Sequence, residues 1–291
     1  MGSGVFTVSA YADYSADLGR SFCTSTMRIE GQTFTASNLD ESLDPKNFKL
    51  RECANSEEHP NTVPVILALD VTGSMGAACR ETAEALAVIV KGLYEKIKDV
   101  EFCVMGIGDL DYDRAPIQMS QFESDVRIAV ALDKIWLEFG GGGNAFESYS
   151  AAWWMGLHKT KLDCFDKQGR KGIIITMGDE PLNPYLPNFQ LSRAINESVQ
   201  SDIDTESLYK EASKKFDIFH IAVDDVNSSY HHYEDDIERT FKKVIGDHLR
   251  ISTIQNLSKT IEECILESVN ANASNDEPKA TKLNENGEIE W

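Results

Sequence analysis

Hydrophobic and polar residues follow two alternating patterns from residue 63 onward. Short apolar runs that end at turn residues are typical of buried strands, and stretches with an apolar stripe at helical spacing are typical of amphipathic helices. The runs predict core strands over residues 63–70, 100–108, 171–177, 217–223 and 249–253, with a short antiparallel edge strand over 117–122. The stripes predict helices over residues 77–98, 125–137, 146–158, 205–215, 234–244 and 257–269.

Strands that alternate with helices favour an α/β fold. We predict a doubly wound, mostly parallel sheet flanked by helices, a Rossmann-like arrangement, over residues 61–270. Residues 1–60 carry a mixed pattern, with short strands expected at 5–10 and 27–35. This region is interpreted as an N-terminal extension or arm that packs on the domain. Residues 271–291 are polar and acidic, which predicts a disordered tail.

Charge and cysteine usage exclude several classes of function. The formal charge of −20 argues against a nucleic-acid-binding surface and against binding to an anionic membrane, and it suits cations or basic partners. The six cysteines form no CxxC pair, which predicts buried free thiols of a reducing cytoplasm and not a zinc site. No signal peptide and no membrane-spanning apolar run is visible, so a cytoplasmic protein is expected.

The end of the first core strand carries the most informative side chains. Asp70, Thr72 and Ser74 follow the apolar run at alternating positions, with glycines between and after them. A loop after a buried parallel strand opens at the sheet edge where α/β folds bind ligands. One carboxylate and two hydroxyls are oxygen donors suited to a hard divalent cation. The segment therefore predicts a metal site.

Three other segments are expected at the same edge, because the loops that follow parallel strands converge there. They are residues 106–113 with Asp109, residues 140–148 with four glycines, and residues 177–181 with Asp179. Ordinary turn chemistry explains the other acidic residues of the first segment. The glycines lack the lysine of a phosphate-binding Walker loop. Asp179 directly follows an apolar strand, which favours a role as a metal ligand.

The segment Asp70-Val71-Thr72-Gly73-Ser74 resembles the DxSxS or DxTxS signature of von Willebrand factor A (VWA) domains, and the likeness in element order covers roughly residues 60–270. The resemblance implies a metal-ion-dependent adhesion site. Such a site holds magnesium or manganese, with calcium as the third choice. By the same resemblance, an acidic residue of a partner protein completes the metal's shell.

Two further ligand positions of the family come from later loops. The family's Thr after a glycine-rich loop matches Asn144, and the family's later Asp matches Asp179, here in a Gly-Asp-x-Pro turn. Asn144 offers a carbonyl oxygen, and Glu147 or Ser148 are the alternative ligands at this loop. Asp109 is expected behind the ligands, where it would hold waters or orient the hydroxyls.

The predicted function is that of an adaptor or scaffold that binds another protein, such as a ring ATPase or another multi-subunit assembly, through the cation. The alternative is a metal-dependent hydrolase acting on a phosphorylated or nucleotide substrate. Thr72 stands where the related phosphatase pattern has its general acid, so an enzyme is the second choice. A structural subunit with a vestigial metal site is a third hypothesis. His59 is expected to be a structural hydrogen bonder and His220 a core residue.

Overall fold

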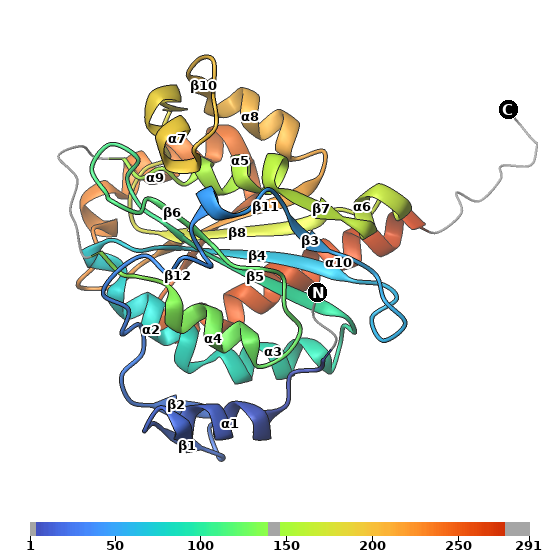
Figure 1. Cartoon of the computed structure of the whole chain (residues 1–291). Helices are drawn as coiled ribbons and strands as arrows, with labels where there is room; N and C mark the ends of the chain where they lie inside the picture. Colours follow the sequence, from blue (N-terminus) through green and yellow to red (C-terminus); the bar gives the residue numbers. More distant parts are fainter. Residues whose placement is uncertain (1–3, 139–145, 277–291) are drawn as a thin grey trace, which may run out of the picture.

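A six-stranded sheet forms the centre of the molecule (Figure 1). The structure is a computed structural model of the 291-residue chain, and it describes residues 4–138 and 146–276. The strands lie in the order β12-β11-β8-β4-β5-β6, all parallel except β6, which is antiparallel to β5. This confirms the predicted sheet. Its strands are β4 Val63–Asp70, β5 Val100–Ile107, β6 Ile117–Met119, β8 Gly172–Gly178, β11 Phe216–Val223 and β12 Leu249–Ser252.

Both faces of the central strand β4 are covered. Val65, Leu67 and Leu69 belong to one apolar cluster, and Ile66 and Ala68 belong to a second cluster on the other face. All five side chains are at most 2% exposed. Since successive residues of a strand point to opposite faces, a strand buried on both sides carries apolar residues throughout. This explains the continuous apolar run that precedes Asp70.

Helices pack on the two faces, as Figure 1 shows. The first layer contains α2 (Gly76–Glu84), α3 (Leu86–Tyr94), α4 (Arg127–Lys134) and α10 (Leu257–Asp276). The second layer contains α5 (Ser150–Lys159), α8 (Thr205–Ala212) and α9 (Tyr230–Ile245). The layers give the doubly wound arrangement. Within the described ranges, none of these helices is both long and apolar enough to cross a membrane.

The N-terminal segment packs against the first helical layer (Figure 1). The Tyr11 hydroxyl donates to the carbonyl of Ala83 at 2.7 Å, and the Arg20 guanidinium pairs with the carboxylate of Asp133 at 2.7 Å. The segment contains α1 (Val8–Asp17) and two antiparallel strands, β1 (Ser21–Cys23) and β2 (Arg28–Glu30). Farther along the chain, β3 (Arg51–Cys53) pairs in parallel with β7 (Thr160–Leu162).

Several elements differ from the predicted ones. The strand expected at 5–10 is wrong, because the side chain of Thr7 accepts a hydrogen bond from Ala10 N and so caps the start of α1. The single helix expected over 77–98 is two helices, since the chain leaves the helical conformation at Ala85. The last helix continues past residue 270 to Asp276, and residues 277–291 of the predicted tail lie outside the described residues.

The segment between β8 and β11 contains elements that the apolar pattern did not indicate. Helix α7 (Asn188–Ile195) lies between two short antiparallel strands, β9 (Tyr185–Leu186) and β10 (Ile203–Asp204). A further short helix, α6 (Asp163–Gln168), precedes β8. Short elements of this kind carry too few apolar positions to show a period.

Candidate functional site

Two acidic residues meet at the carboxyl edge of the sheet. Strands β4 and β8 are neighbours, and Leu69 pairs with Met177, so Asp70 at the end of β4 lies beside the Gly178-Asp179 turn. The charge of Asp179 contributes to a raised pKa of Asp70, which is the effect of two close carboxylates. The structure therefore brings together the two residues that the sequence placed at one rim, though they stand far apart in the chain.

Asp70 is held by three hydrogen bonds and is 0% exposed. Its Oδ1 accepts from the backbone N–H of Thr72 at 2.9 Å and from the hydroxyl of Thr72. Its Oδ2 accepts from the phenol of Tyr149 at 2.7 Å. Burial and the nearby Asp179 raise its pKa, while these hydrogen bonds oppose the rise. The carboxylate is thus fixed in orientation but lacks a positive partner within the described residues.

Asp179 is also buried, and one of its oxygens is left open. Its Oδ2 accepts from the backbone N–H of Ser229 at 2.6 Å. Its Oδ1 is buried and has no hydrogen-bond partner among the described residues. Burial raises the pKa of Asp179, whereas the N–H of Ser229 and the hydroxyl of Ser74 lower it. Ser74, in the single turn Gly73–Met75, therefore lies close to this carboxylate, as the metal-site hypothesis requires.

Tyr149 and Gly178 also belong to the site; the sequence showed Gly178 only as part of the turn that carries Asp179, and it assigned no role to Tyr149. The Tyr149 hydroxyl also accepts a hydrogen bond from the backbone N–H of Glu180 at 3.3 Å, so it bridges the loops that hold Asp70 and Asp179. It lies directly over Gly178, where an added Cβ would stand 2.0 Å from the phenol oxygen. A glycine is needed there for close approach. In the sequence, Tyr149 is one aromatic residue among several near the start of a helix.

Further carboxylates surround this pair. Asp109, after β5, is buried; its Oδ1 accepts from the N–H of Asp111 at 2.7 Å, and its own N–H donates to Asp113 at 2.8 Å. Glu147, just before α5, is 3% exposed, and its pKa is raised by burial and by the charge of Asp70. Asp109 and Glu180 also contribute to that rise, so these side chains share one acidic environment at the sheet edge.

The donor set fits a hard divalent cation. The buried carboxylates of Asp70 and Asp179, the first with a pKa raised by the charge of the second, combine with the open Oδ1 of Asp179 and the hydroxyls of Thr72 and Ser74 into an oxygen-rich environment of negative charge. Among the described residues, however, no three His, Cys, Asp or Glu side chains are arranged as a metal-binding group. The candidate site therefore depends on hydroxyl oxygens as well as carboxylates. Asn144 and the four glycines lie outside the described residues.

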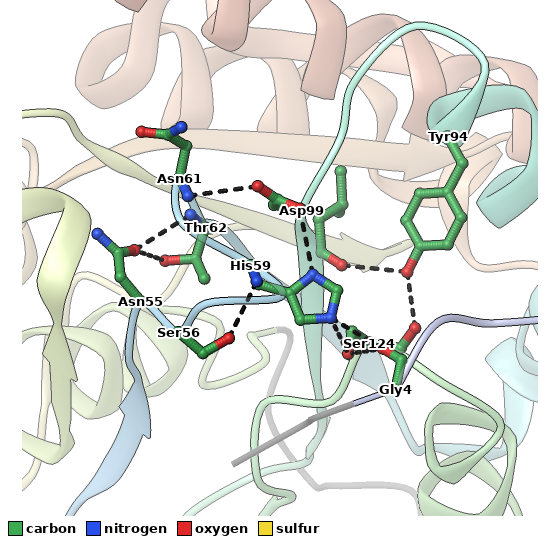
Figure 2. A network of polar contacts seen from close by, with 10 residues as sticks. Gly4, Asn55, Ser56, His59, Asn61, Thr62, Tyr94, Asp99 and Ser124 are labelled. Atoms are coloured by element: carbon green, nitrogen blue, oxygen red, sulfur yellow. Dashed lines mark hydrogen bonds and ion pairs between the residues drawn. The ribbon is translucent and has the colours of Figure 1, made fainter.

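A second polar network lies elsewhere, around His59 (Figure 2). Its ring nitrogens lie 3.2 Å from Oδ1 of Asp99 and 3.0 Å from the carbonyl oxygen of Gly4, and Ser124 Oγ lies 3.5 Å from Nε2. The Ser124 hydroxyl is buried and donates to the Gly4 carbonyl at 2.5 Å instead of to the ring. The group therefore secures the N-terminal segment, in agreement with the structural role expected of His59, and does not form a nucleophile–base pair.

Searches against protein-family models and against curated proteins find no match for this chain. Among solved structures, the pilus adhesin SpaC from Lactobacillus rhamnosus GG in its open conformation is similar with a TM-score of 0.45 and 12% identity, covering 75% of this chain and 31% of that one. The von Willebrand factor domain of the type V pili tip protein Mfa5 from Porphyromonas gingivalis is similar with a TM-score of 0.47 and 12% identity. The match covers 76% of this chain and 98% of that one.

A third similar structure is proximal thread matrix protein 1 from the mussel byssus, with a TM-score of 0.42, 12% identity, and coverage of 72% of this chain and 48% of that one. The chain spans about a third of the length of the SpaC chain. The fold and the site themselves define an α/β protein with a buried acidic centre at the carboxyl edge of its sheet.

Proposed function

We propose that this chain is a VWA-type protein-binding module whose contacts depend on a divalent cation. The observation that carries the proposal is the buried pair Asp70 and Asp179. Two carboxylates lie close together from adjacent strands, and Oδ1 of Asp179 lacks a hydrogen-bond partner among the described residues. An isolated buried charge is costly, and a cation bound between the two would offset that cost.

Five residues would hold the cation, which is Mg²⁺ or Mn²⁺, and a sixth would support them. The carboxylates of Asp70 and Asp179 supply two negative charges that balance one divalent ion. The other direct ligands are neutral oxygens, which leave the ion able to accept an acidic side chain from a partner. Asp109 orients waters or hydroxyls from behind. The complete set is Asp70, Thr72, Ser74, Asn144, Asp179 and Asp109.

The partner is another protein that presents one Asp or Glu to the cation. The chain's charge of −20 would repel a broadly acidic surface, so the partner's acidic residue would lie within an otherwise basic surface. A ring ATPase or another multi-subunit assembly in the cytoplasm is the proposed setting, and this part rests on the family resemblance. Neither nucleic acid nor an anionic membrane suits a surface of this charge.

Thermal unfolding with and without cation tests the site. A ligand that binds only the folded state stabilises it by about 2.7 kcal/mol at a concentration of 100 times Kd. We expect Mg²⁺ or Mn²⁺ to raise the Tm of the wild-type chain, and Asp70→Asn or Asp179→Asn to abolish the rise. Asp236→Asn, at an exposed position of α9, is the matched control and should keep it. An unchanged Tm in the wild type at millimolar cation would refute the metal site.

The hydrolase alternative is tested in the same samples. Both oxygens of Asp70 accept hydrogen bonds and the side chain is buried, an environment that suits a fixed ligand better than an attacking nucleophile. We expect no turnover of a generic phosphate ester with Mg²⁺. Magnesium-dependent turnover that Asp70→Asn abolishes would instead establish the enzyme.

A further inference from the structure

A cavity of about 240 Å³ lies beside the edge strand β6, and three basic side chains line it. One wall is a face of α4, on which Arg127 and Lys134 stand two helical turns apart. The segment that follows β6 forms another wall, and the loop at residues 42–43 lines the cavity together with Arg51 of β3. In a chain with a charge of −20, three cations around one cavity point to a ligand of negative charge.

This cavity is separate from the acidic centre. Glu123, which lines the cavity, forms an antiparallel bridge with Phe102 near the start of β5. Asp70, in contrast, pairs with Ile107 at the end of β5. A strand rises about 3.3 Å per residue, so the two places lie about 16 Å apart along β5. A ligand of the cavity is therefore independent of the proposed cation.

Arg51 carries a charge that no carboxylate among the described residues balances. Its Nη2 donates to the carbonyl oxygens of Met119, at 2.8 Å, and of Ser42. The guanidinium lies over the ring of Phe48, with Cζ 3.6 Å from the ring centroid. Its Nε is buried and has no hydrogen-bond partner in the described part of the chain. Since a partly buried charge is normally paired, Arg51 is suited to bind an anion.

Lys134 lies close to Arg51, because both side chains bind the same residue. The Nζ of Lys134 donates to Oγ of Ser42 at 3.0 Å, while Arg51 donates to the carbonyl oxygen of Ser42. The ion pair of Lys134 with Asp40 is long, at 3.4 Å. Two cations that meet on one residue repel each other, and this single carboxylate does not balance both. An anion bound between the two cations would.

The charges around the cavity favour one kind of anion. Arg127 is already paired, with Asp125 at 2.8 Å and with Glu123 at 3.0 Å. The other two cations, set against their single carboxylate, have one positive charge in excess. One carboxylate group matches that excess, whereas a doubly charged phosphate would bring a second negative charge close to Glu123.

The remaining walls and the volume limit the body of the ligand. Leu43, Val130 and Ala131 give the cavity an apolar lining beside the cations. Pockets for drug-sized molecules span roughly 300–1,000 Å³. A cavity of about 240 Å³ therefore suits a smaller molecule with a short hydrocarbon part.

We propose that this cavity binds a small monocarboxylate, with its carboxylate between Arg51 and Lys134 and its hydrocarbon part against the apolar lining. Bound in this way, the ligand links the loop at residues 42–43 to α4. Free carboxylic acids and the C-terminus of a polypeptide both carry this group, and the experiment distinguishes them.

NMR titration of isotope-labelled protein tests the site, with butyrate as the probe. We expect butyrate to shift the Nε–H signal of Arg51 and the backbone signals of Leu43 and Ala131. Butyramide has the same shape and no charge, so it should leave these signals in place. Inorganic phosphate should bind less tightly than butyrate. N-acetylalanine, which carries its carboxylate next to a peptide bond, represents the C-terminus of a polypeptide.

Two variants change the site without removing the contacts of Arg51. Lys134→Met removes one cation, and Ala131→Leu keeps every charge and fills part of the cavity. We expect each to weaken butyrate binding by about tenfold or more, which for Lys134 is the usual effect of losing a hydrogen bond to a charged group. Lys161→Met is the matched control, because it removes an exposed cation of β7 that is paired with Glu52. It should change the affinity by less than about threefold, the range of exposed ion pairs. Circular dichroism verifies that each variant is folded.

The possible outcomes decide the proposal. Absence of any shift with butyrate at millimolar concentration overturns it, and so do equal shifts with butyramide or tighter binding of phosphate. Equal weakening by Lys134→Met and Lys161→Met also overturns it, because the effect is then one of general charge. If butyrate binds as expected, tighter binding of N-acetylalanine identifies a polypeptide C-terminus as the source, and weaker binding identifies a free acid. None of these results depends on the cation site.

Discussion

The phenol of Tyr149 donates a hydrogen bond of 2.7 Å to Oδ2 of Asp70. Tyr149 comes from the segment that leads into α5, and Asp70 ends β4, so this bond ties the helical layer to the end of the central strand. Because the same hydroxyl accepts from the N–H of Glu180, it also fixes the loop that carries Asp179. Tyr149 is thus a positioning residue for both carboxylates of the proposed site.

Tyr149→Phe removes the hydroxyl and keeps the ring. We expect the free energy of unfolding to fall by about 1–3 kcal/mol, because a buried oxygen of Asp70 loses its donor. The Mn²⁺ affinity should fall about 10–100-fold, the usual effect of losing a group that orients a ligand. Urea unfolding in EDTA and Mn²⁺ titration measure the two effects separately. Tyr209→Phe is the control, since the Tyr209 hydroxyl forms no hydrogen bond among the described residues; an equal loss there would contradict the assigned role.

Gly178→Ala tests the close approach of Tyr149 to the strand end. The added methyl would stand 2.0 Å from the phenol oxygen and 2.3 Å from Cζ, so the ring must move. We expect a loss of about 1–3 kcal/mol, the usual cost of overpacking. In a Tyr149→Ala background the same substitution should cost much less, because the obstructing ring is gone. A cost that is equal in the two backgrounds, measured by urea unfolding, would show that the strain lies elsewhere.

The sequence predicts the central sheet and the meeting of Asp70 with Asp179 because both follow from simple rules. A strand buried on both faces must be apolar throughout, so the start of β4 at Val63 and its end at Asp70 can be read from the apolar run. Parallel strands send their following loops to one edge, so two acidic residues at the ends of such strands become neighbours. Neither inference needs knowledge of how particular side chains pack.

The parts that the sequence did not reveal depend on tertiary contacts. Tyr149 reaches Asp70 across the sheet edge, and no spacing in the chain records which aromatic residue will do so. The exit from helical geometry at Ala85 divides a stretch whose apolar stripe continues on both sides. Helix α7 (Asn188–Ile195) is too short for its period to stand out from the surrounding loop.

The ion pair between Arg20 and Asp133 provides a test of how firmly the N-terminal segment is attached. The guanidinium makes two hydrogen bonds of 2.7 Å to the carboxylate, and the Tyr14 hydroxyl donates to the same carboxylate at 2.8 Å. Arg20 is buried, so Arg20→Met leaves a partly buried charge without its cation. We expect a loss of about 3–5 kcal/mol and faster proteolysis before residue 40.

The double variant Arg20→Met, Asp133→Leu is the control for this ion pair. It replaces both charges by apolar groups, which is often neutral in buried pairs, so it should recover most of the stability lost in Arg20→Met. Urea unfolding and limited trypsin digestion measure the two effects. A single variant that costs less than about 1 kcal/mol, the range of exposed pairs, would mean that the segment is only loosely attached.

Glu101 on β5 makes the stability of the fold depend on pH. The side chain is buried, and burial raises its pKa to about 7, although the Cys53 thiol and the charge of His59 act in the opposite direction. In the unfolded chain the carboxyl group titrates at its ordinary value near 4.5. The folded state therefore prefers the protonated form, and this group's contribution to the free energy of unfolding falls as the pH rises from about 4.5 to about 7.

Glu101→Gln removes this titration while keeping the shape of the side chain. At pH 4 the variant and the wild type should have similar free energies of unfolding, because the carboxyl group is protonated in both states. At pH 8 the variant should be more stable, by up to about 3 kcal/mol at 1.36 kcal/mol per unit of pKa difference. Urea unfolding of both proteins between pH 4 and pH 8, compared at each pH, cancels the titration of all other groups. A difference that does not change with pH would mean that the carboxyl group of Glu101 has the same pKa in the folded and the unfolded protein, and would contradict this prediction.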